Sequence, residues 1–93
     1  MKVNDLVFQS HPGAPGGKQA IVFFPNGFGA SIVCGAPGLY AADGSFELAV
    51  LKGTKYKWDL CYTTPITSDV IGWLPPEELE EILRQIESLP KAA

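Results

Sequence analysis

Hydrophobic residues recur along this chain with two different periods, one typical of strands and one typical of a helix. Over residues 46–52 the pattern repeats every second residue, which predicts a strand with both faces at least partly covered. Near the C-terminus the spacing becomes i, i+3, i+4, i+7, a single apolar stripe of Leu79, Ile82, Leu83, Ile86 and Leu89. The pattern as a whole predicts strands over about 3–9, 20–25, 29–35, 46–52 and 57–62 and a helix over about 75–89.

The predicted helix has signals at both ends. Pro75 and Pro76 suit the first helical positions, because the N–H that proline lacks would be unpaired there. Glu77 and Glu78 follow at the positive end of the helix dipole, and Pro90 ends the helix. Burying the five stripe residues contributes roughly 7–15 kcal/mol before opposing terms, so we expect the helix to pack on the sheet.

Glycine and proline mark the turns. Asn26-Gly27 is a strong hairpin signal and predicts a type I′ turn, with Pro25 opening the ladder slightly before the tip. Gly53-Thr54 predicts a second reversal. Ser68 or Asp69 is expected to cap a short turn over residues 70–74.

These elements predict one α+β domain over residues 1–93: an antiparallel sheet of about five strands, with one C-terminal amphipathic helix packed on one face. With a single helix available, we expect the other sheet face to lie open to water or to a partner.

Charge and composition narrow the function classes. The formal net charge is −3, and all of the excess falls in residues 75–93, where five glutamates face Arg84 and Lys91. Residues 1–74 are balanced, which argues against nucleic-acid binding by bulk charge. The sequence has no run of 18 apolar residues and no secretory signal at its start, so we expect no membrane span and a cytoplasmic location in a bacterial host cell.

The sequence offers little for catalysis. His11 is the single histidine and lies in a loop rich in glycine and proline, a poor place for a general base. Cys34 and Cys61 fall in predicted strands and are expected to be reduced core residues. Glycine motifs ending at Lys18 and starting at Gly27 lack the helix that phosphate or dinucleotide binding needs. We therefore expect no enzyme activity, no metal site and no cofactor.

Three groups of residues are candidate contacts. Asn26 and Phe28 lie at the hairpin tip, where an exposed aromatic would meet a protein and a folded-back one would pack on the sheet. Acidic residues on the helix could dock a basic patch or simply solvate the helix: Glu77, Glu80 and Glu81, with Glu80–Arg84 as an i, i+4 pair. Aromatic and basic residues could hold a small ligand or nucleotide by stacking and charge: Tyr40, Lys55, Tyr56 and Trp58.

Three segments carry a resemblance: Asn26–Val33, Phe46–Val50 and Thr64–Val70. In these the chain resembles small proteins encoded by bacteriophages and prophages, over most of residues 19–89. The resemblance implies a phage accessory context and transfers no functional residue.

The sequence thus leads to a functional hypothesis with two alternatives. The first is a non-enzymatic, phage-type accessory protein that binds another protein and modulates a host factor or defence component. The alternatives are a small-ligand or nucleotide-binding protein, and a homo-oligomeric structural protein that self-associates through its uncovered sheet face.

Overall fold

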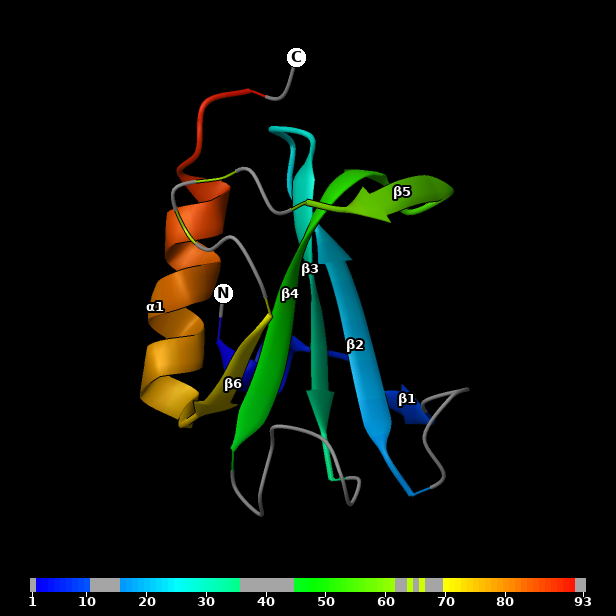
Figure 1. Ribbon diagram of the computed structural model, residues 1–93, viewed down its shortest axis with the longest axis vertical. Helices are drawn as coiled ribbons and strands as arrows, with labels where there is room; N and C mark the ends of the chain where they lie inside the picture. The colour runs from blue at the N-terminus through cyan, green and yellow to red at the C-terminus, as the bar shows by residue number, and fades with distance from the viewer. Residues whose placement is uncertain are drawn as a thin grey trace.

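The structure, a computed structural model, describes residues 2–10, 16–35, 45–61, 64, 66 and 70–91. Within these residues six strands and one α-helix follow a short 3-10 turn, η1 (Val3–Asp5). The elements are β1 (Gln9–Ser10), β2 (Lys18–Phe23), β3 (Phe28–Cys34), β4 (Phe46–Thr54), β5 (Lys57–Leu60), β6 (Ile71–Leu74) and α1 (Pro76–Glu87). The predicted α+β class, with one C-terminal helix on an antiparallel sheet, is confirmed (Figure 1).

All strand pairs are antiparallel, in the order β1-β2-β3-β4-β5. The long strand β4 has β3 on one side and two short strands on the other. Its first half pairs with β6, where Phe46 lies opposite Leu74, and its second half pairs with β5, where Thr54 lies opposite Lys57. The sheet curls into a half-barrel, and α1 lies along one side of it (Figure 1).

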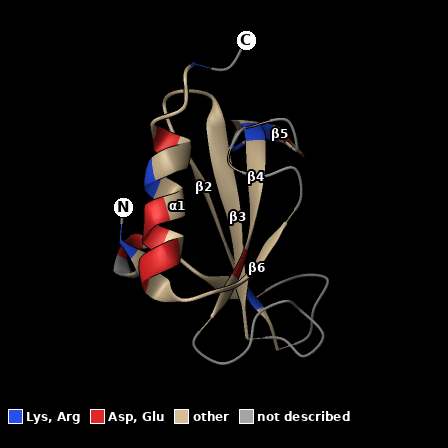
Figure 2. Ribbon diagram, turned by 60° about the vertical axis from the view of Figure 1, so that its left-hand side comes forward, with Lys and Arg blue, Asp and Glu red and all other residues tan. Residues whose placement is uncertain are grey.

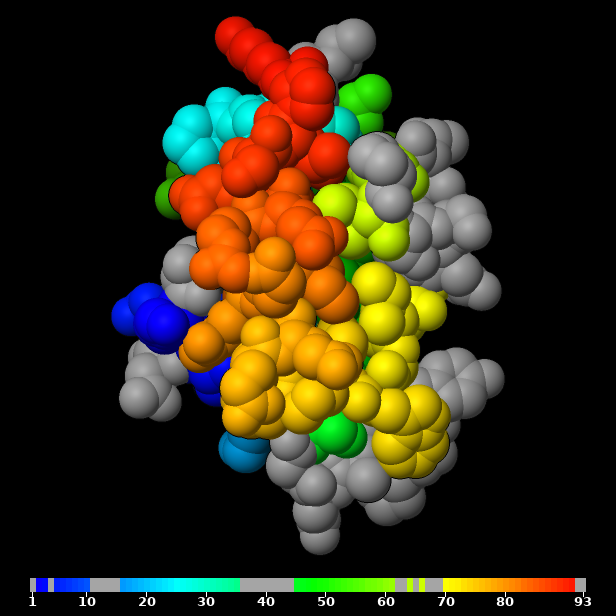
Figure 3. All heavy atoms as spheres, turned by 90° about the vertical axis from the view of Figure 1, so that its left-hand side faces the viewer, coloured from blue at the N-terminus to red at the C-terminus, as the bar shows by residue number. Residues whose placement is uncertain are grey.

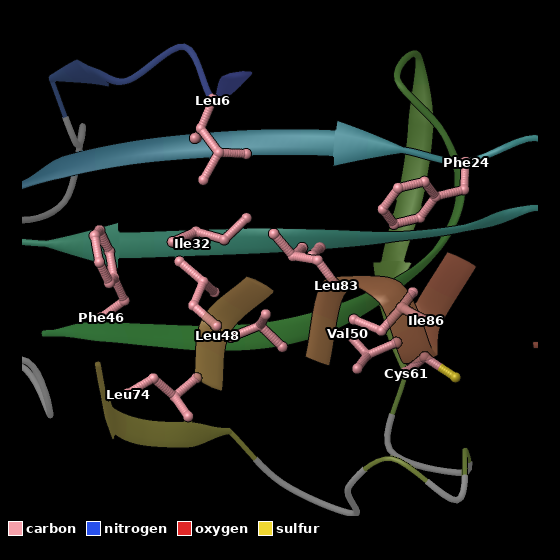
Figure 4. Close-up of a cluster of buried hydrophobic side chains, with 13 residues drawn as sticks. Leu6, Phe24, Ile32, Phe46, Leu48, Val50, Cys61, Leu74, Leu83 and Ile86 are labelled. Carbon is pink, nitrogen blue, oxygen red and sulfur yellow. The ribbon is translucent and has the colours of Figure 1, made fainter. Parts of the chain in front are cut away.

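The core lies between α1 and the sheet. The helical stripe supplies Leu79, Leu83 and Ile86, each fully buried. Facing them are alternate residues of β3 and β4, because side chains in a strand point to opposite faces in turn. Figure 4 shows these side chains converging, among them Ile32, Leu48, Val50, Leu74, Leu83 and Ile86.

The turn at residues 25–27 differs from the predicted type I′ turn. Among described residues other than glycine, positive φ occurs at Trp73, so Asn26 is not left-handed, whereas Gly27 has φ 84°. The N–H of Phe24 donates to the carbonyl of Phe28 (2.8 Å), and that of Gly27 to the carbonyl of Phe24 (3.2 Å). The proline ring fixes the φ angle of Pro25 at a value that suits the first loop position of an ordinary turn. Gly27, two residues later, takes the left-handed conformation. The reversal itself is confirmed, but the ladder stays closed up to Phe24.

The N-terminal strand predicted over 3–9 is largely wrong. Val3–Asp5 forms η1, and only Gln9–Ser10 pairs with β2. The backbone N–H of Val3 donates to a carboxylate oxygen of Glu80 on α1 (2.8 Å). Leu6 is buried in the core, and Phe8 stacks on Phe46 with ring centroids 6.0 Å apart. The segment therefore leaves the sheet edge to reach the helix, as Figure 3 shows for the N-terminus beside α1.

Two further boundaries differ from prediction. Strand β4 continues to Thr54 and the chain reverses at residues 55–56, not at Gly53-Thr54. Residues 71–74, predicted as a capped turn, form β6, while Ser68 and Asp69 lie outside the described residues. Leu48 pairs with Ile71 and Phe46 with Leu74, so two residues of β6 oppose one of β4 in a bulge. Trp73 in this bulge has φ 57° and is exposed, a strained conformation for a bulky residue.

Candidate functional site

The sheet face opposite α1 carries exposed apolar side chains from β2 and from β5. The strand registers place these side chains in neighbouring rows of one face. We call it the open face. Successive cross-strand partners run from β2 to β5: Phe23 opposite Gly29, Gly29 opposite Leu51, and Leu51 opposite Leu60. Ile21 and Trp58 lie in the neighbouring rows of the same face.

The middle of the open face is closed and its two flanks are exposed. Leu51 in β4 has no exposed surface, and the hydroxyl of Ser31 in β3 accepts a hydrogen bond from the side-chain amide of Gln19 (2.8 Å). On the flanks, Ile21 is 40% exposed, Trp58 37%, Leu60 50% and Tyr56 85%. This arrangement presents apolar side chains around a satisfied, buried floor.

A groove of about 470 Å³ runs between β2 and the tip of the β4–β5 hairpin. Ile21 and Phe23 form one wall, and the segment from Gly53 to Tyr56 forms the other. A second hollow, lined by Val7, Gln9, Ser10, Gln19 and Ile21, lies on the other side of Ile21. Ile21 thus stands between two depressions on the surface of β2.

Two glycines give the groove its shape. A Cβ on Gly29 would lie 2.6 Å from a ring carbon of Phe23 and 2.3 Å from the carbonyl oxygen of Val22, so only glycine lets this ring lie over β3. Gly53 has φ 131°, and a Cβ there would lie 2.3 Å from the carbonyl oxygen of Lys57. Glycine at 53 therefore allows β5 to approach β4 closely where the hairpin bends.

The predicted ligand contacts lie partly at this groove. Lys55, Tyr56 and Trp58 are together on the β4–β5 hairpin, and the Lys55 ammonium is 5.1 Å from the centroid of the Tyr56 ring. Tyr40 lies outside the described residues. Lys52 and Lys57 add positive charge on the same hairpin, with Asp59 between them in the ladder. Sequence reasoning did not select Ile21, Phe23 or Leu60, although the alternation in β2 and β5 signals that each points to one face.

The predicted contacts at the hairpin tip turn inward. Phe28 is half-buried and packs against the core. The side-chain amide of Asn26 donates toward three carbonyl oxygens at the end of α1, those of Ile86 (2.9 Å), Glu87 (3.2 Å) and Leu89 (3.1 Å). Its oxygen accepts the N–H of Phe28 (3.0 Å). Asn26 thus adds hydrogen bonds at the helix C-terminus, where the Ile86 carbonyl also accepts the N–H of Leu89 (3.1 Å), and fastens α1 to the hairpin.

Two of the predicted acidic contacts on α1 have partners within the chain. Glu80 pairs with Lys2 (3.6 Å) besides accepting the Val3 N–H, and Arg84 pairs with Glu81 rather than with Glu80 as predicted. These side chains share a shallow hollow with Glu77, which is exposed. Figure 2 shows the acidic residues along the outward side of the helix. Since Lys2 comes from outside α1 and pairs with Glu80, the surface around this helix carries less negative charge than the helix sequence alone.

Reactive groups are few in the described part of the chain. No three His, Cys, Asp or Glu residues there gather as metal ligands. Cys61 is buried and Cys34 half-buried, both as free thiols. Burial raises the pKa of the Cys34 thiol, and Lys18 opposes this shift, so Cys34 is a poor nucleophile at neutral pH. His11 lies outside the described residues.

Within the described residues, α1 is too short and too polar to cross a membrane. Comparison of the chain with protein-family models, with curated proteins and with solved structures found no match.

Proposed function

We propose that this chain is a non-enzymatic protein-binding module that docks its partner on the open face. The observation that carries the proposal is the set of four exposed apolar side chains on the open face, Ile21, Tyr56, Trp58 and Leu60, of which Ile21 and Tyr56 line the groove. Clustered exposed apolar surface is typical of interaction sites, and tryptophan and tyrosine are enriched there.

Charge at the hairpin refines the partner's chemistry. Lys55 lies beside Tyr56 at the groove, whereas Lys52, Lys57 and Asp59 are one residue out of step with Leu51, Trp58 and Leu60 and so point to the other face of the hairpin. A matching partner surface would present an apolar centre with an acidic group opposite Lys55, which speeds association and favours the correct orientation. In the phage accessory context that the sequence suggests, this partner would be a host factor or a defence component.

A matched pair of variants tests the proposal. Leu60→Lys adds a positive charge in the open face, and Gln85→Lys adds the same charge on the exposed side of α1. A partner captured from host cells is purified and titrated against each chain by calorimetry. We expect Leu60→Lys to weaken binding by at least about tenfold, in the range of interface hot spots, and Gln85→Lys to leave it unchanged. Equal affinity of both variants would place the contact surface elsewhere.

A second candidate function is small-ligand or nucleotide binding. The groove volume of about 470 Å³ lies in the range of ligand sites, and Lys55 beside Tyr56 offers charge and stacking together. Thermal-shift measurements with nucleotides test it, since a ligand present at 100 times its Kd stabilises by about 2.7 kcal/mol. No shift at millimolar nucleotide would dismiss this function.

A further inference from the structure

Strand β5 presents an unpaired backbone edge among the described residues. It pairs with β4 on one side, and no described segment pairs with its other side. The N–H of Cys61 donates to the carbonyl of Val50 (2.8 Å), which continues the β4–β5 register. In an antiparallel ladder the hydrogen-bonded residues alternate. Lys57 and Asp59 therefore bond to β4, whereas the N–H and C=O groups of Trp58 and Leu60 point outward.

We propose that a second copy of this chain pairs with this edge, antiparallel, with Trp58 opposite Trp58 of the second copy. Every residue of β5 is exposed, and no described segment pairs with its outer edge. The proposal goes beyond the open-face function and does not depend on any other partner.

Charge selects this register over its neighbours. With Trp58 at the twofold axis, Lys57 of each copy lies opposite Asp59 of the other, giving two attractive pairs. Moving the axis to residue 59 would place Asp59 against Asp59, and moving it to residue 57 would place Lys57 against Lys57. Opposite charges directly across a ladder stabilise it and like charges destabilise it. Moving the axis by one residue keeps outward backbone groups opposite outward backbone groups, so charge separates these registers, and of the three only the Trp58 register pairs both charges favourably.

Within each chain Lys52 lies opposite Asp59. The row across the dimer therefore reads Lys52, Asp59, Lys57 of the second copy and Thr54 of the second copy, with charges alternating in sign. Trp58 and Leu60 of the two copies lie on one face, so pairing joins the two open faces along a continuous sheet. A dimer built this way would offer two grooves to one partner or to two.

Sedimentation of the purified chain from about 10 μM to 1 mM tests the dimer, because this range detects a dimer with a Kd as weak as about 1 mM, a binding free energy of about −4 kcal/mol. Lys57→Asp and Asp59→Lys each convert two attractive pairs into two repulsive pairs, so each should raise the dimer Kd by at least about fivefold. Lys57→Asp/Asp59→Lys restores both pairs and should recover the original Kd. An equimolar mixture of the two single variants should form a heterodimer, since all its cross-strand pairs are opposite in charge.

Thermal melting of each variant separates a loss of pairing from a loss of fold. Amide hydrogen exchange adds an independent measurement, because the N–H of Trp58 should become protected as concentration rises while that of Asp59, already in the ladder, should not change. A wild-type chain that stays monomeric at 1 mM would overturn the proposal. A dimer whose Kd in both single variants equals that of the wild-type chain would overturn it as well, by placing the contact away from β5.

Discussion

Removing the side-chain amide of Asn26 should loosen the end of α1. This amide donates toward three carbonyl oxygens from the last buried residue of the helix, Ile86, onward, and its oxygen accepts the N–H of Phe28. Asn26 lies in the loop between β2 and β3, about sixty residues before these carbonyls in the chain. Asn26 therefore links the β2–β3 loop to the C-terminal end of α1, which covers the core.

The magnitude follows from the bonds that each variant loses. An amide has two N–H groups, so the three carbonyls share two donated bonds, and Asn26→Ala removes these and the accepted bond. At about 0.5–1.5 kcal/mol per bond the expected cost is about 2–4 kcal/mol. Asn26→Asp keeps the bond from Phe28 but replaces the donor with negative charge at the negative end of the helix dipole, a further 0.3–1 kcal/mol or so. We expect it to cost about as much as Asn26→Ala, because the added repulsion replaces the loss of the bond from Phe28.

Urea denaturation followed by far-UV circular dichroism measures both costs. A domain of this size has a stability of about 5–15 kcal/mol, so a loss of 2–4 kcal/mol shifts the midpoint clearly. Gln85→Ala is the matched control on the exposed side of α1, and it should change stability by no more than about 0.5 kcal/mol. If Asn26→Ala behaved like this control, Asn26 would not fasten the helix.

Three further outcomes follow from packing and burial. Leu83→Ala, which empties a fully buried position on α1, should cost about 2–5 kcal/mol in the same denaturation assay; an unchanged midpoint would mean that the helix is not docked. Gly29→Ala should cost about 1–3 kcal/mol because its Cβ would clash with the Phe23 ring and with backbone, and melting with no loss would contradict the close approach seen there. Because burial raises the Cys34 pKa above its ordinary value of 9.0, the thiol's contribution to stability is complete below pH 9 and declines as pH rises through the raised value. Comparison with Cys34→Ser across this range isolates the effect, and identical pH profiles would refute it.

Sequence periodicity predicted the elements whose residues repeat regularly. The spacing of Leu79, Leu83 and Ile86 fits a helix, and β4 alternates over enough residues to be recognised as a strand. The sequence also carried the reversal at Asn26-Gly27. It could not reveal the turn type, because that depends on Pro25 occupying the first loop position and on Asn26 being engaged by α1.

Contacts between distant parts of the chain account for most of what the sequence did not predict. Glu80, 77 residues after Val3, draws the N-terminal segment away from the sheet edge. Strand β6 has four residues, one of them Gly72, and exists through its pairing with the start of β4. The same limit applies to the candidate site. The chain supplies Ile21 and Leu60, but only the fold shows that α1 covers the opposite face and leaves both exposed.

Amide hydrogen exchange of the chain, free and bound to its captured partner, tests the central claim most directly. If the open face is the docking surface, protection on binding should appear at the β4–β5 hairpin and at the exposed edge of β2 around Ile21 and Phe23, while the amides of α1 keep their free-state rates. Protection confined to the glutamate-bearing turns of α1, with the β4–β5 hairpin unchanged, would contradict the account.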